Sequence, residues 1–276
     1  MGKTTLNIRG RLLDLSEPKV MGIINITPDS FFADSRAGTI KEAVEKSIKM
    51  LEEGADILDI GGFSTRPGSQ EVSFDNERER AIPVIEAIIK EVPQAIISID
   101  SFRTELVREA IDKGASIIND ITAGQEDGMF ELAASSKLPY VMMHMRGPIS
   151  RMMENTNYTN LEIEITNYFQ ERVTKLKELG CIDMILDPGF GFSKSLDQNY
   201  EILKNLSYFE VFEHPILVGV SRKSMIYKYL NTTAANALNG TSVLNFEALQ
   251  KGARILRVHD VKEAVETIKL YKKIAC

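Results

Sequence analysis

Short apolar runs recur along the chain, and most of them end on polar residues. One such run, residues 184–186, has no period of two, which is typical of a strand covered on both faces in a parallel sheet flanked by helices. Asp187 follows it, and Pro188 and Gly189 then end the strand, so we expect the carboxylate at the strand's C-terminal end. An aspartate that merely caps a turn would give the same local pattern, and the repetition of this layout favours a functional position.

A glycine precedes several of these runs. Gly114, Gly180 and Gly252 each end a stretch with helical spacing and are followed by an apolar strand with polar residues at its end, which indicates a repeated unit. Eight strands are expected in this way, at Met21, Ile57, Ile96, Ile117, Val141, Ile185, Leu217 and Ile255.

Amphipathic helices are expected between the strands, most clearly at 103–113 and 261–274. Another helix should begin at Thr39, where Thr39 and Glu42 have the spacing of a capping box, and end at Gly54. Residues 161–165, LEIEI, alternate like a strand, but the apolar positions that continue to residue 179 favour a helix.

Eight strand–helix units in 276 residues predict an α/β fold, a (β/α)8 TIM barrel that forms a single domain over residues 1–276. A doubly wound open sheet is the weaker alternative. In the barrel, the active site lies at the C-terminal ends of the strands.

Composition narrows the function. The chain has 33 basic and 39 acidic residues, a net charge of −6, and no long basic run, so neither nucleic acid nor an anionic membrane is an expected partner. No apolar stretch approaches the roughly 18 residues of a spanning helix, and the first residues lack the apolar core of a signal peptide, so we expect a cytoplasmic protein. The two cysteines, Cys181 and Cys276, suggest no disulfide framework or metal cluster.

If the barrel forms, its mouth collects the polar side chains that follow the strands: Asn25, Thr65, Arg66, Asp100, Asn119, His144, Asp187, Lys223, Arg257 and His259. The acceptor-rich members, Asp100, Asn119 and Asp187, suit a heterocycle with several N–H donors, whereas the cationic members suit anions. Arg257 and His259 follow the last strand, where this fold habitually binds phosphate. The ligand should therefore have two unlike ends.

Simpler readings exist for some of these residues. His144 could equally be a hydrogen-bonded histidine packed among methionines, and we leave it out of the site. His214 precedes a strand and should lie at the opposite rim. Lys223 and its neighbour Arg222 could form a solvated helix start, and the scattered methionines are better explained as core residues than as a cofactor site.

The chain resembles the dihydropteroate synthases of bacterial folate biosynthesis. The resemblance covers nearly the whole chain and rests on a series of motifs in the family's order and spacing: MGIINITPDSFFADS, GGFSTRPG, SIDS, IIND, MMHMRG, DPGFGFSK, GVSRKS and RVHDV. It implies a transferase that condenses 6-hydroxymethyl-7,8-dihydropterin diphosphate with 4-aminobenzoate, releasing diphosphate, with Mg²⁺ as cofactor. It also implies a homodimer and a protein of the class that sulfonamides target.

The resemblance assigns roles to matching positions. Asp100, Asn119, Asp187 and Lys223 would bind the pterin, Arg257 and His259 the diphosphate, and Asn25 the magnesium. Thr65 would contact the pterin diphosphate, while Arg66, Pro67 and Ser224 would help to form the aminobenzoate pocket, with a helix starting near Ser221 behind its carboxylate. The residues expected to take part in catalysis are Asp100, Lys223, Arg257 and His259.

Some positions depart from the family's usual pattern. Phe63 stands where glutamate or glutamine is common, and Ser101 and Arg103 replace a frequent threonine and lysine. Two other readings remain: a methyltransferase with the same pterin-binding barrel, and a non-catalytic pterin-binding barrel. The anion-binding residues argue against both, because neither a methyl transfer nor simple pterin binding needs a diphosphate site.

Overall fold

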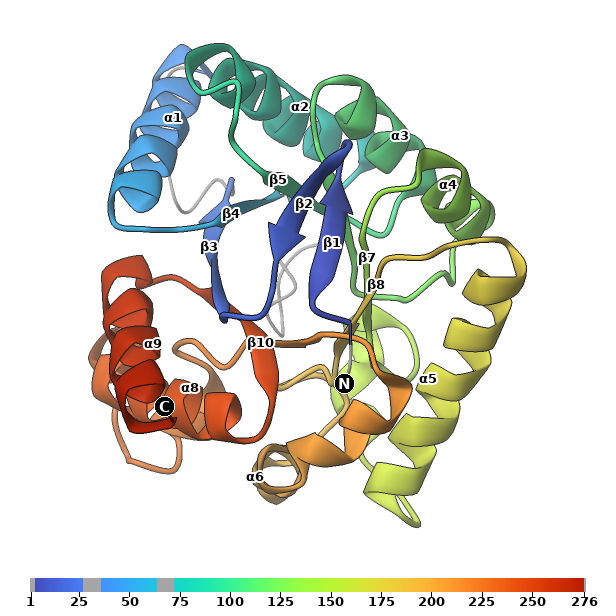
Figure 1. Ribbon diagram of the computed structural model, residues 1–276, viewed down its shortest axis with the longest axis vertical. Helices are drawn as coiled ribbons and strands as arrows, with labels where there is room; N and C mark the ends of the chain where they lie inside the picture. The colour runs from blue at the N-terminus through green and yellow to red at the C-terminus, as the bar shows by residue number, and fades with distance from the viewer. Residues whose placement is uncertain (1–2, 27–35, 64–71, 276) are drawn as a thin grey trace.

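A computed structural model describes residues 3–26, 36–63 and 72–275, with the side chains of residues 36–39 left out. Within these ranges, eight parallel strands close into a barrel, each paired with its neighbours in chain order and the last paired with the first (Figure 1). The strands are β3 (Lys19–Asn25), β4 (Ile57–Gly61), β5 (Ile97–Asp100), β6 (Ile117–Asp120), β7 (Tyr140–Met143), β8 (Met184–Asp187), β9 (Ile216–Val218) and β10 (Ala253–Val258). The predicted TIM barrel is confirmed, and the open sheet is excluded.

Helices surround the barrel (Figure 1). They are α1 (Arg36–Glu52), α2 (Phe74–Glu91), α3 (Thr104–Asp112), α4 (Met129–Ser136), α5 (Leu161–Glu178), α6 (Leu196–Lys204), α7 (Ser224–Tyr227), α8 (Leu238–Gln250) and α9 (Val261–Ala275), with 3-10 turns η2 (Ile149–Glu154), η3 (Leu206–Phe212) and η4 (Ala234–Asn236). The alternating residues 161–165 open α5, where the Asn160 side chain accepts from Ile163 N, so the helical interpretation is confirmed.

The expected start of the first helix was wrong. Helix α1 begins at Arg36, so Thr39 lies within it and cannot be its cap. Arg36 and Ala37 are good helix formers, and they extend the helix upstream of the apparent capping box. The predicted end is confirmed, because Gly54 adopts a φ of +102° directly after α1.

Gly114, Gly180 and Gly252 also follow the C-terminal ends of helices, as Gly54 does. Their φ angles are +116°, +87° and +94°, in the left-handed region that L side chains rarely adopt. Each ends a helix in the manner of a C-terminal glycine, and a barrel strand begins one to four residues later. The glycine spacing in the sequence therefore did mark the repeating unit.

An apolar layer fills the middle of the barrel. Its buried members are Met21, Ile57, Ile117, Val141, Ile185, Leu217 and Ile255, with Ile96 packed against them. These are the residues at which the strands were predicted. Since side chains alternate along a strand, the residues two positions further on also point inward, one layer nearer the C-terminal ends of the strands.

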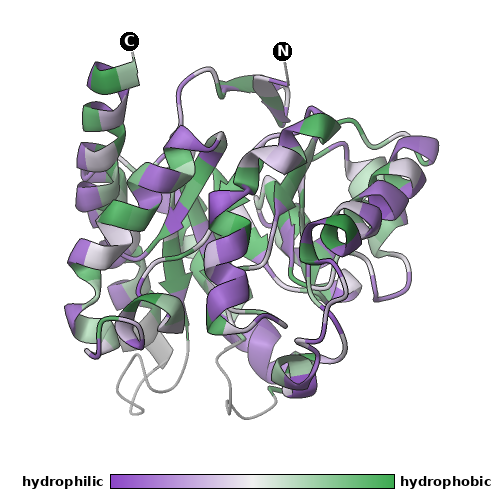
Figure 2. Ribbon diagram, turned by 90° about the horizontal axis from the view of Figure 1, so that it is seen from below, coloured by the Kyte–Doolittle hydropathy of each residue, from purple (hydrophilic) through white to green (hydrophobic). Residues whose placement is uncertain are grey.

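The other end of the barrel is closed by an antiparallel hairpin that the sequence analysis did not foresee. Strands β1 (Thr5–Ile8) and β2 (Arg11–Asp14) pair there, and Leu6, Ile8 and Leu15 join the apolar layer from below. The hairpin lies across the barrel in Figure 1, at the end where α9 finishes in Figure 2. The hairpin covers this end of the barrel, and we call the opposite end, where the strands finish, the mouth.

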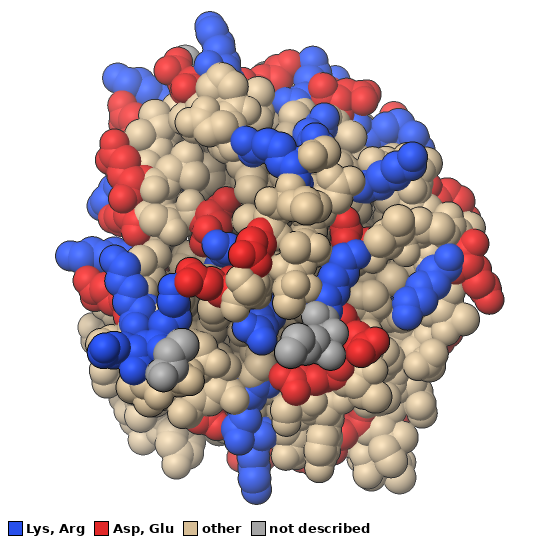
Figure 3. Space-filling view, viewed as in Figure 1, with Lys and Arg blue, Asp and Glu red and all other residues tan. Residues whose placement is uncertain are grey.

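The surface carries charges of both signs. Acidic and basic side chains are interspersed on the hairpin face (Figure 3), as the moderate net charge of −6 leads one to expect. Among the described helices, none combines the length and the apolar character needed to cross a membrane.

Candidate active site

Polar side chains form the layer directly above the apolar core of the barrel. Asp59, two residues after Ile57 on β4, is fully buried, with 0% of its surface exposed. Its carboxylate accepts hydrogen bonds from Asn119 Nδ2 at 3.1 and 3.3 Å and from Arg257 Nε at 2.6 Å. Strands far apart in the sequence are thus linked across the interior of the barrel.

Asp100 stands at the mouth end of this network. It pairs with Asn119 in the register of β5 and β6, and its Oδ2 lies 2.5 Å from Arg257 Nη2. Gly61 of β4 faces it, and a Cβ at that position would lie 3.4 Å from Asp100 Cβ, in ordinary van der Waals contact. Burial raises the pKa of the Asp100 carboxyl above its usual range; Arg257 opposes this rise, and the nearby carboxylate of Asp59 adds to it.

Asp187 is held at the end of β8 by the turn that follows it. Its Oδ1 accepts from Gly189 N at 2.8 Å. Gly189 has a φ of +71°, and a Cβ there would lie 2.1 Å from the backbone oxygen of His144, so glycine is required. Burial raises the pKa of Asp187, while Lys223 acts in the opposite direction.

Lys223 reaches the same turn from the loop after β9. Its Nζ donates to the backbone oxygen of Phe190 and lies 4.9 Å from the centre of the Phe192 ring. Lys223 is partly buried; burial lowers the pKa of its ammonium group to about 8, and the nearby carboxylate of Asp187 opposes this change. A solvated surface lysine is therefore the wrong reading of this residue.

The helix expected near Ser221 begins three residues later. Arg222 has a φ of +53° and Lys223 an extended backbone, so α7 starts at Ser224 and makes only one turn. Arg222 is bound to Asp260 by two hydrogen bonds, Nε–Oδ2 at 2.8 Å and Nη2–Oδ1 at 2.9 Å. Ser224, assigned to the aminobenzoate pocket, thus opens a single helical turn.

His259 follows β10 and contacts the loop after β9. Its Nδ1 lies 3.0 Å from Ser221 Oγ, which also accepts from His259 N at 3.1 Å. Together with the Arg222–Asp260 pair, these contacts tie the two last loops of the barrel to each other. This is where the sequence placed an anion site.

Behind the Asp187 turn lies a cation that the sequence analysis missed. Lys194 is 1% exposed, and its Nζ lies 3.0 Å from Gly189 O, 3.1 Å from Phe192 O and 3.0 Å from His144 Nδ1. Burial lowers the pKa of Lys194 to about 7. The His144 ring packs against Tyr168 on α5, with ring centres 4.7 Å apart, which supports its omission from the site.

An apolar cluster borders the polar residues. Its buried members are Ile121, Met143, Met145, Met152 and Phe192, with Phe102 and Ile149 packed against them. Met143 and Met145 follow Val141 at inward-pointing positions of β7 and the loop after it. Both are buried, so the interpretation of the methionines as core residues holds for them as well, whereas Met153 is exposed.

Some predicted site residues cannot be compared with the structure. Thr65, Arg66 and Pro67 lie outside the described residues. Asn25 ends β3 opposite Gly61 of β4 and is partly buried. In the described part of the chain, no three His, Cys, Asp or Glu side chains gather as a metal-binding group. Asn25 could offer Mg²⁺ one amide oxygen, which suits an ion bound mainly by phosphate and water.

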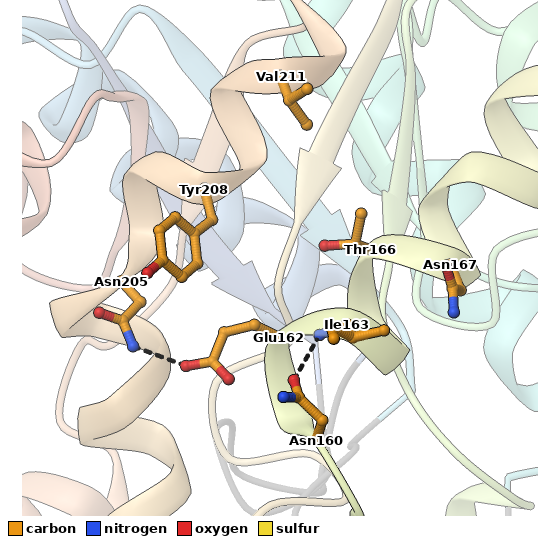
Figure 4. Close-up of a pocket in the computed structure, with 8 residues that line it drawn as sticks. All are labelled: Asn160, Glu162, Ile163, Thr166, Asn167, Asn205, Tyr208 and Val211. Carbon is orange, nitrogen blue, oxygen red and sulfur yellow. Dashed lines mark hydrogen bonds between the residues drawn. The ribbon is translucent and has the colours of Figure 1, made fainter.

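A separate depression lies on the outer surface. It has a volume of 570 Å³ and is lined by Asn160, Glu162, Ile163, Thr166, Asn167, Asn205, Tyr208 and Val211 (Figure 4). Its polar groups are partly engaged with each other, as in the 2.6 Å bond from Asn205 Nδ2 to Glu162 Oε1. No cation lines it, so it does not compete with the mouth as the candidate site.

The arrangement defines a class. The chain matches the family model of pterin-binding enzymes over residues 21–259, and its structure is a (β/α)8 barrel with buried acceptors and partly buried cations at the mouth. Curated relatives narrow the class further. The chain is 44% identical to a dihydropteroate synthase of Escherichia coli K12, covering 95% of this chain and 93% of that protein. It is 40% identical to the dihydropteroate synthase of Haemophilus influenzae, covering 98% of each chain.

Solved structures agree with these relatives. A Yersinia pestis dihydropteroate synthase in a sulfonamide drug complex superposes with a TM-score of 0.92 at 40% identity, covering 98% of this chain and 99% of that one. A Xanthomonas albilineans dihydropteroate synthase with 4-aminobenzoic acid gives 0.91 at 35% identity, covering 100% and 99%. The chain belongs to the dihydropteroate synthase family of transferases, so the resemblance seen in the sequence is confirmed.

Proposed function

We propose that this protein condenses 6-hydroxymethyl-7,8-dihydropterin diphosphate with 4-aminobenzoate, giving 7,8-dihydropteroate and diphosphate. One observation carries the proposal: the mouth holds acceptors and cations as two adjoining sets, joined by the Arg257–Asp100 contact of 2.5 Å. A molecule with a donor-rich ring at one end and a diphosphate at the other meets both sets.

The acceptor set suits the pterin ring. A carboxylate can accept two parallel N–H bonds, and Asp187, 7% exposed at the end of β8, offers its oxygens to the 2-amino-4-oxo edge of a pterin. Asn119 and Asp100 supply further acceptors from adjacent strands. Lys223 contributes a cation beside Asp187, and the apolar cluster with Met143 and Met145 offers a wall for the flat ring.

The cation set suits the leaving group. Arg257 lies on β10 and His259 in the loop directly after it. Both side chains would bind and orient the diphosphate. Mg²⁺ at Asn25 would neutralise part of the diphosphate charge when bound. The aminobenzoate would lie beside Ser224, with Arg66 and Pro67 completing its pocket.

The order in which bonds break and form depends on the electronic properties of the two substrates. An arylamine is a poor nucleophile, whereas the pterin ring delocalises positive charge from its exocyclic methylene once diphosphate departs. We propose that the carbon–oxygen bond breaks first, with Asp100 stabilising the cation and Arg257 and His259 stabilising the departing anion. The amine of aminobenzoate then attacks the methylene carbon and loses a proton.

The direct test mixes the enzyme with pterin diphosphate, 4-aminobenzoate and Mg²⁺, and follows diphosphate and dihydropteroate. Formation of both products supports the synthase. Pterin binding without turnover would instead indicate a non-catalytic barrel, and methyl transfer from a methylated pterin to a corrinoid protein would indicate the related methyltransferase.

A second experiment tests the order of events. Enzyme, Mg²⁺ and pterin diphosphate alone should release some diphosphate, and labelled diphosphate should exchange back into the substrate. Asp100→Asn should suppress this exchange. A strict requirement for aminobenzoate before any exchange would indicate direct displacement.

We also propose a cytoplasmic homodimer. Helices α8 and α9 expose the apolar side chains Val243, Leu270 and Ile274. Pairing of two such faces would bury them. Light scattering on the wild type and on a Val243→Asp/Leu270→Asp variant tests this: the wild type should have twice the mass of the chain, and the variant should be a monomer.

A further inference from the structure

Asp59 occupies the centre of the polar network, although it does not stand at a strand end. It lies within β4, between Leu58 and Ile60, one inward-pointing position above the apolar core of the barrel. Its side chain is 0% exposed, and the described side chains that donate hydrogen bonds to it, Asn119 and Arg257, both belong to the proposed pterin diphosphate site.

The contact with Asn119 determines which end of the amide faces the ligand. An ionised carboxylate only accepts hydrogen bonds, whereas an amide has a donor end and an acceptor end. Asn119 Nδ2 lies 3.1 Å from Asp59 Oδ2 and 3.3 Å from Oδ1. The opposite orientation would place the amide oxygen against the carboxylate, so Asp59 keeps Asn119 Oδ1 available as an acceptor.

The contact with Arg257 determines where the guanidinium lies. Arg257 Nε donates to Asp59 at 2.6 Å, while Nη2 of the same group reaches Asp100 at 2.5 Å. Asp59 is the deeper of the two carboxylates, because it pairs with Ser98 in the β4–β5 register and Asp100 lies two residues further along β5. It therefore anchors the inner edge of the guanidinium, and the outer edge stays level with Asp100 at the mouth.

We propose that Asp59 is a positioning residue of the pterin diphosphate site. It does not touch the ligand; it fixes the acceptor end of Asn119 and the depth of Arg257, and so couples the pterin half of the site to the diphosphate half. This inference rests on the proposed substrate.

The test is Asp59→Asn, which keeps the size of the side chain but removes the acceptor-only character. We expect binding of both 6-hydroxymethylpterin and its diphosphate to weaken at least tenfold in calorimetry, with a greater loss for the diphosphate because Arg257 is also released. The apparent KM for aminobenzoate at saturating pterin diphosphate should change less than threefold. The matched control is Asp56→Asn, three residues earlier at the other rim, where the carboxylate accepts from Val20 N; it should bind both pterins like the wild type.

The swapped variant Asp59→Asn/Asn119→Asp separates positioning from general destabilisation. It restores an amide–carboxylate pair and presents an acceptor to the ligand. Its affinity for 6-hydroxymethylpterin should therefore be at least fivefold higher than that of Asp59→Asn. The extra loss for the diphosphate should remain, because Arg257 still lacks its inner carboxylate.

The outcomes are distinct. The positioning role is overturned if Asp59→Asn, per folded molecule, binds both pterins within threefold of the wild type. It is also overturned if the swapped variant recovers no binding. If Asp59→Asn does not fold, the swapped variant alone tests the proposal. Its affinity for the pterin diphosphate, divided by its affinity for 6-hydroxymethylpterin, must be at least threefold lower than the same ratio in the wild type. Failure of the wild type to bind either pterin would overturn the proposed function instead.

Discussion

Lys194 Nζ lies 3.0 Å from His144 Nδ1, and both side chains are buried behind the turn that carries Asp187. The same Nζ donates to the backbone oxygens of Gly189 and Phe192. One side chain thus fastens the turn after β8 to the end of β7. The lysine stabilises the shape of the site from outside the mouth.

We predict that Lys194→Met destabilises the protein and weakens pterin binding. Two buried carbonyls lose their donor, which costs about 1–3 kcal/mol in the free energy of unfolding. Urea unfolding and calorimetry with pterin diphosphate measure the two effects. Lys204→Met, the same change at an exposed position at the end of α6, should alter neither. Equal behaviour of the two variants would contradict the role given to Lys194.

Gly189→Ala should remove activity, whereas Gly180→Ala should only reduce stability. Both glycines have positive φ angles, +71° and +87°, so both alanines are strained by about 1–2 kcal/mol. Only at Gly189 would the new Cβ meet a backbone atom, His144 O at 2.1 Å, while at Gly180 nothing lies within 4 Å. The displaced turn would misplace Asp187, and a shift of about 1 Å can cost roughly 100-fold in kcat/KM.

The comparison needs steady-state kinetics and thermal unfolding on both variants. A Gly189→Ala enzyme with the kcat/KM of Gly180→Ala would show that the geometry of this turn does not matter for turnover.

Asp187→Asn should weaken binding of pterin diphosphate by about 2–4 kcal/mol, because a charge-assisted pair is lost and a donor then faces a donor. Calorimetry gives the affinity directly. Asp197→Asn, an exposed acid in the first turn of α6, is the control and should bind normally. Unchanged affinity in Asp187→Asn would remove this residue from the pterin site.

His259→Ala should weaken diphosphate-bearing pterin far more than pterin without diphosphate. The expected difference is about 1.5–3 kcal/mol, the value of a hydrogen bond to a charged group. Arg257→Ala should show the same selectivity with an added loss of stability, because Arg257 also neutralises Asp59 and Asp100. Equal losses for the two ligands would exclude a diphosphate site at these residues.

His214 predicts a pH dependence of stability. The pKa of this histidine is lowered to about 4, mainly by burial and in addition by Lys177 and Lys3, while Asp183 opposes the change. Among the described residues, neither ring nitrogen has a hydrogen-bond partner. The unfolded chain, with a histidine pKa of about 6.5, binds more protons in this range, so the stability contributed by neutral His214 is complete above pH 6.5 and decreases towards pH 4.

The measurement is urea unfolding of the wild type and of His214→Asn at pH 7 and pH 5. The wild type should lose more free energy of unfolding between the two pH values than the variant does. The same loss in both proteins would show that His214 does not titrate on unfolding.

Most of the fold could be predicted from the sequence. The eight residues at which strands were predicted are the inner layer of the barrel and its neighbour Ile96, because continuous apolar runs are what strands buried on both faces require. The hairpin β1–β2 was missed because its exposed strand, with Leu12 pointing to solvent, has no such run. The start of α1 was missed because a capping pattern can also occur inside a helix.

The site was predictable where polar residues end strands and less so where they lie within one. Asp100, Asn119, Asp187 and Arg257 were found because they stand at or near strand ends. Asp59 was concealed between Leu58 and Ile60, although counting two residues from the inward-pointing Ile57 would have placed it inside the barrel. Lys194 ends the motif DPGFGFSK, but no role was assigned to it, since its burial depends on how two loops pack.

The link between Arg257 and Asp59 also bears on how the protein is made. These residues are 198 positions apart, and the strand that carries Arg257 is the last of the barrel. At a synthesis rate of roughly 5–20 residues per second, the ribosome adds the arginine about 10–40 s after the aspartate. During that time the nascent chain has the acids of the site without the cation that neutralises them, so the barrel can neither close nor hold its substrate until translation has passed β10.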